Sequence, residues 1–202
     1  EEAIQIGGRM VQSILKGRAM IQFGRELKRL VEKGKIAKDY ADEKNGFQAL
    51  SDILLFIDSE APDEDRLNAV KALFVSAIAV DETEAEKILN YQLFKIIMKL
   101  SSSQILILKS CFDSKDEQQV FASMGDYVQG WFTFVSQKIG HNLPSLIEYD
   151  EKVLVDLKLI TPRSGNVDER ASLANARLTD LAIKICEKLE KYSQEILKII
   201  EK

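Results

Sequence analysis

The sequence has 202 residues, of which 46% are hydrophobic and 30% are charged, and its 32 acidic and 28 basic residues leave a formal net charge of −4. This composition is typical of a folded globular protein, and the presence of only two Cys excludes a disulfide-rich secreted domain. A single His and two widely separated Cys also exclude a zinc site of His and Cys ligands, and no apolar run reaches the roughly 18 residues of a membrane-spanning helix.

The first half of the chain is predicted to be helical, because apolar residues recur at steps of three and four. The first row of this kind predicts a long amphipathic helix over residues 9–33, ended by Gly34. A second helix is expected over residues 46–57. A third is expected to begin near Pro62, since the acids that follow are typical of a first helical turn.

Three further helices are predicted before the chain changes in character. Asp81 and the Glu three residues later resemble a capping box, and the helix that they begin should extend to Leu100. Ser101 and the Gln three residues later repeat the pattern and predict a shorter helix through Phe112. A stripe of apolar residues over 121–139, followed by a Gly, predicts the sixth helix.

Residues 141–202 predict one small β-hairpin, the only β structure that we expect. The elements in order are a helix over 145–157, a strand over 157–161, a polar loop over 162–170, a strand over 171–178 and a helix over 180–202 that Thr179 caps. This order is typical of a winged helix-turn-helix unit. We therefore predict a predominantly α fold: a multi-helix domain over residues 1–140 and a winged-helix-like part over residues 141–202 with a long C-terminal helix, packed as one unit.

Residues 154–160 (LVDLKLI) and 178–182 (LTDLA) resemble the leucine and threonine skeleton of winged-helix domains. Such domains commonly carry Gly where this chain has Lys158 and Ala182, so the chain departs from the pattern at those positions. The resemblance implies a winged-helix fold for the C-terminal part and supplies no catalytic residue.

Residues 94–101 (FKIIMKLS), which run on to Ile107 and Leu108, are similar to a segment of the Abi-alpha family. These are helical bacterial proteins linked by name to abortive infection of phage. The family tends to have Glu-Ala where this chain has Gln104 and Ile105. The resemblance implies a helical bacterial protein with a setting in phage defence, and it too supplies no catalytic residue.

Residue types that often carry chemistry are better explained here as structural ones. His141 follows Gly140 at a helix end, where an imidazole helps to satisfy carbonyl groups, and a catalytic His would need a partner group. Cys111 and Cys186 lie in apolar helical stripes and are expected to be buried thiols of a reducing compartment. With no secretory signal in the sequence, we expect a cytoplasmic protein.

Five carboxylates crowd into one short stretch, which raises the question of a metal site. A calcium loop requires a fixed alternation of ligands with a Gly at its turn, and that pattern is missing. Acids at a helix N-terminus explain the stretch better. We therefore expect no metal, no cofactor and no catalytic centre. The five acids are Asp58, Glu60, Asp63, Glu64 and Asp65.

Charge is distributed unevenly along the chain. Residues 1–38 hold nine basic and four acidic residues, a sum of +5, and residues 39–70 hold two basic and nine acidic residues, a sum of −7. The basic helix either serves an anionic surface, nucleic acid or lipid headgroups, or complements the acidic segment within the fold or between subunits. We favour the second alternative, which needs no ligand. The candidate anion-binding residues are Arg9, Lys16, Arg18, Arg25, Lys28 and Arg29, with Arg163, Arg170 and Arg177 in the expected wing.

The expected recognition helix of the winged-helix-like part argues against DNA reading. Residues 145–157 hold four acids and the single basic residue Lys152, and carboxylates repel a phosphate backbone. We expect this part to contact protein or to be purely structural.

Both ends of the chain carry apolar or small residues at alternating steps of three and four, the spacing of a helix-packing seam. Each seam either packs within the monomer or forms a dimer interface, and both alternatives are open. The N-terminal seam comprises Gly7, Met10, Ile14, Gly17, Ile21 and Gly24. The C-terminal seam begins at Leu178 and Ala182 and continues with the candidate interface residues Ile185, Leu189, Tyr192, Ile196 and Ile199.

The sequence therefore predicts a non-enzymatic cytoplasmic protein that binds another protein or itself. The alternative is a nucleic-acid-binding regulator that uses the basic N-terminal helix and the wing arginines, and its affinity would fall with added salt. A membrane surface ranks third as a partner, and no small-molecule substrate is inferred.

Overall fold

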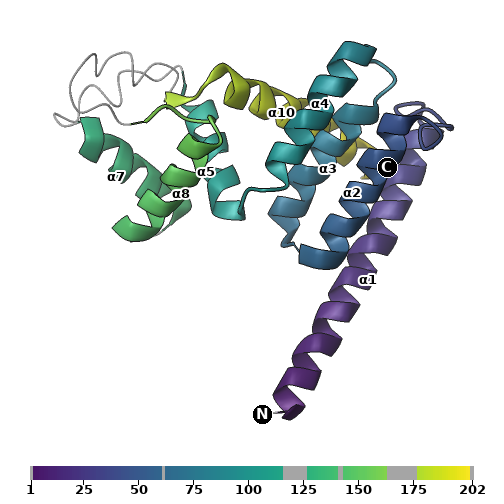
Figure 1. Cartoon of the computed structure of the whole chain (residues 1–202), viewed down its shortest axis with the longest axis horizontal. Helices are drawn as coiled ribbons and strands as arrows, with labels where there is room; N and C mark the ends of the chain where they lie inside the picture. The colour runs from purple at the N-terminus through teal and green to yellow at the C-terminus, as the bar shows by residue number, and fades with distance from the viewer. Residues whose placement is uncertain (1, 61, 116–126, 141–142, 163–176, 201–202) are drawn as a thin grey trace. The chain divides into compact units, whose positions relative to one another are not determined.

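A computed structural model describes residues 2–60, 62–115, 127–140, 143–162 and 177–200 of the chain. These residues form eight α-helices and no strand, which confirms the predominantly α fold (Figure 1). The helices are α1 (Glu2–Glu32), α2 (Lys44–Glu60), α3 (Glu64–Ile78), α4 (Glu84–Ile97), α5 (Ser102–Asp113), α7 (Tyr127–Ile139), α8 (Pro144–Asp156) and α10 (Asp180–Ile200).

The chain divides into two compact units. Unit 1 comprises Glu1–Lys99 and Lys188–Lys202, and unit 2 comprises Leu100–Glu187. Helix α10 begins in unit 2 and ends in unit 1. The division of the chain at residue 140 into a helical domain and a winged-helix-like part stays a prediction.

Helix α3 is the centre of unit 1. Every residue of α3 from Ala69 to its end is buried, because the run is apolar apart from Lys71 and Ser76. Helices α2 and α4 pack against it on either side (Figure 1). The ring of Phe74 meets Phe23 of α1 edge-on, with their centroids 5.4 Å apart. Three helices therefore share one core with the second half of α1.

The ends of the helices follow local capping rules, and one predicted cap is wrong. Helix α4 begins at Thr83, whose side chain forms a capping box with Glu86, and not at Asp81. The predicted box at Ser101 is confirmed, because its side chain accepts from the backbone N–H of Gln104. Helix α3 has the expected acidic start, with Asp63 as its N-cap.

In unit 2, helices α5, α7 and α8 pack against one another. Trp131 of α7, Leu108 of α5 and Leu154 of α8 are almost completely buried in this packing. An isolated antiparallel bridge joins Ile160 to Leu178 where the predicted hairpin would begin. Most of the second expected strand lies outside the described residues, so the hairpin stays a prediction.

Two helices end in the same left-handed turn with different residues. After α1, Gly34 has φ +68°, and the N–H groups of Gly34 and Lys35 bond back to Val31 and Leu30. After α8, Lys158 occupies the matching position with φ 60°. This is a Schellman motif, in which Gly avoids the clash that a Cβ makes at positive φ. Lys158 is also one of the positions where winged-helix domains commonly carry Gly.

We expect Lys158→Gly to raise the free energy of unfolding by about 1 kcal/mol, because the left-handed conformation costs a residue with a Cβ about that much. Urea unfolding followed by circular dichroism measures the change. The matched control is Gly34→Ala, which should lower stability by a similar amount; a Cβ at Gly34 meets no atom within 4 Å, so its cost is conformational. A destabilised Lys158→Gly variant would contradict this account.

Candidate interaction surface

The solvent side of α1 carries the second half of the N-terminal seam. The buried residues Phe23 and Leu30 set the side of α1 that faces the core. Ile21, 58% exposed, lies on the opposite side of the helix. A Cβ added at Gly17 or Gly24 would meet no atom within 4 Å. The outer face of α1 comprises Gly17, Arg18, Ile21, Gly24 and Arg25, all of them exposed.

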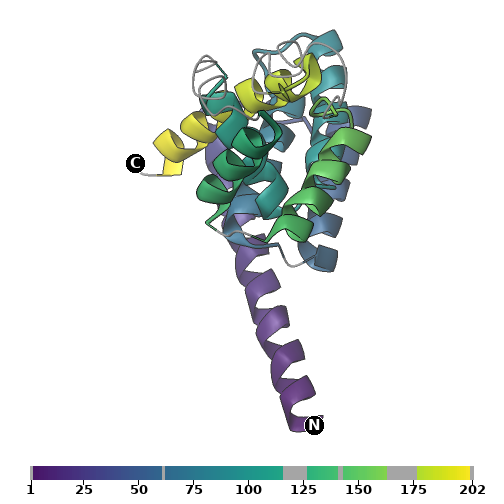
Figure 2. The ribbon, with the colours of Figure 1, turned by 90° about the vertical axis from the view of Figure 1, so that its left-hand side faces the viewer.

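The described side chains in the middle of α1 lie outside the core. Among the side chains that the structure describes between residues 13 and 22, none is buried, and Leu15 is 54% exposed. Figures 1 and 2 show this part of the helix extending beyond α2, α3 and α4. The sequence of this segment contains Gly7, Gly8 and Gly17, and Gly disfavours a helix that stands alone in water.

A buried ion pair holds the second half of α1 in place. Lys71 Nζ of α3 lies 2.7 Å from Glu26 Oε2 of α1, and both residues are about 5% exposed or less. The side-chain amide of Gln22 donates to Glu26 Oε1 at 2.8 Å. The sequence reasoning missed this pair. The sequence feature that could have revealed it is a charged residue, Glu26 or Lys71, at an apolar position of each of the two helices.

The solvent side of α2 is apolar and acidic. Phe47 and Leu55 are 61% and 65% exposed, and Ser51 lies between them on the same side of the helix. Asp58, one turn further on, is also exposed. The outer face of α2 comprises Phe47, Ser51, Leu55 and Asp58. It lies opposite the buried residues of α2, which are Gly46, Ala49, Ile53, Phe56 and Ile57.

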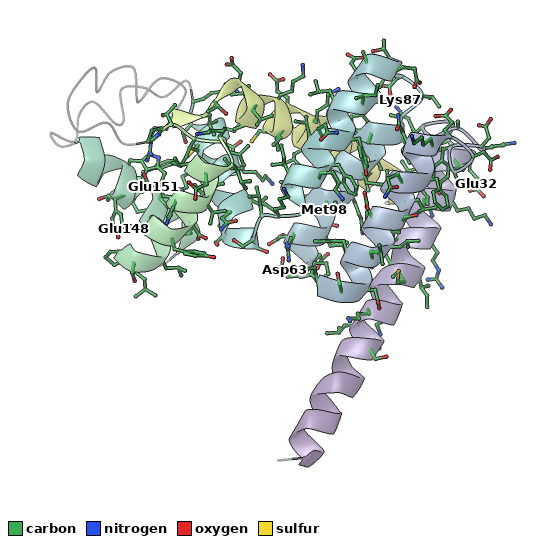
Figure 3. All side chains as sticks on the ribbon, viewed as in Figure 1. Glu32, Asp63, Lys87, Met98, Glu148 and Glu151 are labelled. Carbon is green, nitrogen blue, oxygen red and sulfur yellow. The ribbon has the colours of Figure 1, made fainter. Side chains whose placement is uncertain are left out.

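Two acidic residues in or next to α2 that lie outside this outer face have partners from α4. Asp52 binds Lys95 at 3.1 Å and accepts a hydrogen bond from Tyr91 at 2.6 Å. Burial and this contact with Asp52 raise the pKa of Tyr91 to about 12. Lys87 lies 3.9 Å from Glu43 (Figure 3). These pairs explain part of the complementarity expected between charged segments, but their cations belong to α4 rather than to the basic helix.

The predicted anion-binding residues that the structure describes differ in exposure. Along α1, Arg18, Arg25, Lys28 and Arg29 are exposed, Lys16 is half-buried, and Lys28 lies 3.8 Å from Glu32. The side chain of Arg9, together with Arg163 and Arg170, lies outside what the structure describes.

Arg177 is an internal residue of unit 2 and not an exposed wing arginine. It is 2% exposed, and its guanidinium lies 2.7 Å from Glu151 of α8 and 4.4 Å from the ring centre of Trp131. It also donates to the carbonyl oxygen of Thr161. A guanidinium buried in this way is not presented to a nucleic acid, so the expectation for Arg177 is corrected.

The acids of α8 divide between the interior and the surface. Asp150 is buried and accepts hydrogen bonds from Ser103 at 2.7 Å and Gln104 at 2.9 Å. Glu151 is buried with Arg177, whereas Glu148 is exposed (Figure 3). Large apolar side chains lie beside it on the exposed part of this helix and its N-cap: Leu143, Leu146 and Tyr149.

The C-terminal seam is buried within the chain. Ile185, Leu189, Tyr192 and Ile196 are each at most 8% exposed, which is what the intramolecular alternative predicts. The side chain of Ile199 lies outside what the structure describes. A dimer that uses these residues stays a prediction.

The two cysteine thiols are enclosed within the protein. Cys111 and Cys186 are buried, and burial raises the pKa of each thiol to about 12. A thiol with so high a pKa is almost entirely protonated at neutral pH and is a poor nucleophile. His141 lies outside the described residues. Within those residues, no group of three or more His, Cys, Asp or Glu is placed to hold a metal ion.

Comparison of this chain with protein-family models, curated proteins and solved structures gave no match. The resemblances to winged-helix domains and to the Abi-alpha family therefore rest on the residues quoted for them. None of the helices in the described part of the chain is long and apolar enough to cross a membrane.

Proposed function

We propose that this chain is a non-enzymatic, cytoplasmic protein-binding module and that the outer face of α1 is its binding surface. The observation that carries the proposal is the position of that face on the side of α1 opposite the core, with Ile21 more than half exposed. An apolar side chain flanked by arginines suits a protein partner with apolar and acidic groups. The open space at Gly17 and Gly24 lets a partner helix approach closely.

Unit 2 supports a second contact surface of the same kind. Helix α8, the bridge between Ile160 and Leu178 and helix α10 support a winged-helix-like part over residues 141–202. The exposed Leu146 and Tyr149 of α8 favour a protein over DNA as the partner of this helix. The resemblance to the Abi-alpha family would place the module in bacterial phage defence.

Photo-cross-linking tests the proposal. We expect p-benzoylphenylalanine in place of Ile21 to form discrete adducts with protein when the full chain is irradiated, alone or in an extract of cells that naturally produce it. The matched control carries the same probe in place of Lys109, an exposed residue of α5. Equal labelling from both positions, or no protein adduct from position 21, would contradict the proposal.

A nucleic-acid-binding regulator is the second candidate, and the exposed cations of α1 favour it. Arg18, Arg25 and Lys28 lie on or beside the outer face of α1 and would contact phosphates. Their contribution should disappear steeply as salt is added, because binding releases counterions. Fluorescence anisotropy of labelled single- and double-stranded oligonucleotides, titrated with the protein, separates the candidates. An anisotropy that does not rise as protein is added at low salt eliminates the regulator.

A further inference from the structure

We infer that the outer face of α1 binds the outer face of α2 in a second copy of this chain, so that two copies exchange their α1 segments reciprocally. The inference rests on the proposed function and names the partner of the same surface. It commits to self-association through α1 and α2, and not through the buried C-terminal seam.

The two outer faces are similar in length and in chemical kind. The outer face of α1 extends over residues 17–25, about 13 Å, and the outer face of α2 over residues 47–58, about 18 Å, at 1.5 Å per residue. Each face combines exposed apolar side chains with small residues: Ile21 with two glycines on α1, and Phe47 and Leu55 with Ser51 on α2. Large side chains of one helix can therefore enter the gaps of the other.

The two segments that carry the outer faces have net charges of opposite sign. Arg18 and Arg25 flank Ile21 in a segment with a sum of +5 over residues 1–38. The outer face of α2 has the exposed Lys44 beside its start and Asp58 at its end, in a segment with a sum of −7 over residues 39–70. Pairing α1 with a second α1 would bring four arginines together. Pairing the acidic segments with each other would bring their carboxylates together. The α1-to-α2 arrangement brings segments of opposite net charge into contact.

One chain cannot make this contact by itself. Helices α1 and α2 already contact each other within unit 1, and both direct their buried residues to the shared core. Their outer faces lie on the opposite sides of the two helices and cannot turn toward each other without breaking that core. The outer face of α2 that α1 binds must therefore belong to another molecule.

Reciprocal exchange gives a closed dimer. In a two-fold arrangement the α1-to-α2 contact occurs twice, which doubles the area buried. A stable interface buries roughly 800 Å² on each partner, more than one short helix contact supplies. A two-fold dimer also leaves neither outer face exposed, so association stops at two copies.

Size-exclusion chromatography of the chain, followed by multi-angle light scattering, tests the inference. We expect a concentration-dependent dimer of twice the monomer mass of 22.8 kDa. Ile21→Glu and Leu55→Glu should each raise the dissociation constant about tenfold or more, because each puts a carboxylate at the centre of both contacts. The matched control is Leu106→Glu, which changes an exposed leucine of α5 and should leave the dimer unchanged. Circular dichroism melting confirms that each variant is folded.

Mixing the two variants identifies which faces meet. In a dimer of one Ile21→Glu copy and one Leu55→Glu copy, one α1-to-α2 contact holds both substitutions and the other holds neither. The mixture should therefore dimerise more tightly than either variant alone. Pairing of α1 with α1 predicts instead that Leu55→Glu still dimerises by itself, and that result would overturn the inference. A wild-type monomer at every concentration tested, or a dimer indifferent to both substitutions, would also overturn it.

The outcomes for this inference and for the proposed function are distinct. If position 21 cross-links to a different protein while the purified chain stays monomeric, the binding surface is supported and the second copy is eliminated. If position 21 yields no protein adduct and the chain is monomeric, both fail. A cross-link from position 21 to a peptide of α2, identified by mass spectrometry in the dimer band, supports both.

Discussion

We expect Lys71→Ala to lower the free energy of unfolding by about 3–5 kcal/mol, because it leaves the carboxylate of Glu26 buried without its cation. Both side chains are at most 7% exposed, so solvent cannot replace the lost partner. The substitution should also loosen α1, since the pair and the contact of Phe23 with Phe74 hold that helix to α3. Urea unfolding measures the first effect, and amide hydrogen exchange along α1 measures the second.

The control replaces both charges by apolar groups of similar size. The double variant Glu26→Leu/Lys71→Met should recover most of the stability that Lys71→Ala loses, since a buried ion pair contributes little beyond an apolar pair of the same volume. Lys28→Ala removes an exposed Lys that pairs within α1 and should change stability by less than about 0.5 kcal/mol. A Lys71→Ala variant as stable as wild type would mean that water reaches Glu26.

The helices of this chain could be predicted because their signals are local. Apolar spacing indicates where a helix lies. Ser101 with Gln104 marks where α5 begins, and Gly34 at positive φ marks where α1 ends. The cap of α4 was misplaced for a reason that is not local. Asp81 and Thr83 are both good caps, but Asp81 lies 3.2 Å from Lys191, more than a hundred residues away in the sequence.

The two seams show what periodicity leaves open. A repeat of three and four predicts that residues share one side of a helix, but not whether that side faces the core. The C-terminal seam is buried, whereas Gly17, Ile21 and Gly24 face away from Phe23. Only the position of the neighbouring helices distinguishes the two cases, and that position depends on contacts far apart in the sequence.

The same limit explains the interpretation of Arg177. Its place in the expected wing, with Arg163 and Arg170, predicts an exposed cation. Its burial depends on Glu151 and Trp131, which come from two other helices. Which of them meet is decided by the packing of α7 against α8.

The second large effect concerns Glu82, and we expect its contribution to depend on pH. Burial alone would raise the pKa of this carboxyl, but hydrogen bonds from Lys188, Tyr192 and Lys191 outweigh it and lower the pKa from 4.5 to about 2. Because the folded state holds the proton less tightly than the unfolded state, the stabilisation is complete above about pH 5 and is lost as the pH falls toward 2. It amounts to about 3 kcal/mol.

Replacing Glu82 by Gln should therefore cost about 3 kcal/mol at pH 7 and almost nothing at pH 2, so the difference between wild type and variant isolates this carboxyl from the other acids. Urea unfolding at intervals between these pH values measures it. The control is Asp81→Asn: its side chain is 45% exposed beside Lys191, and its effect should stay within about 0.5 kcal/mol. A constant difference at all pH values would show that Glu82 acts by shape rather than by charge. A difference that grows with pH would show instead that the carboxylate of Glu82 holds the second half of α10 in place. Lys188, Lys191 and Tyr192, which contact this carboxylate, all belong to that half of the helix.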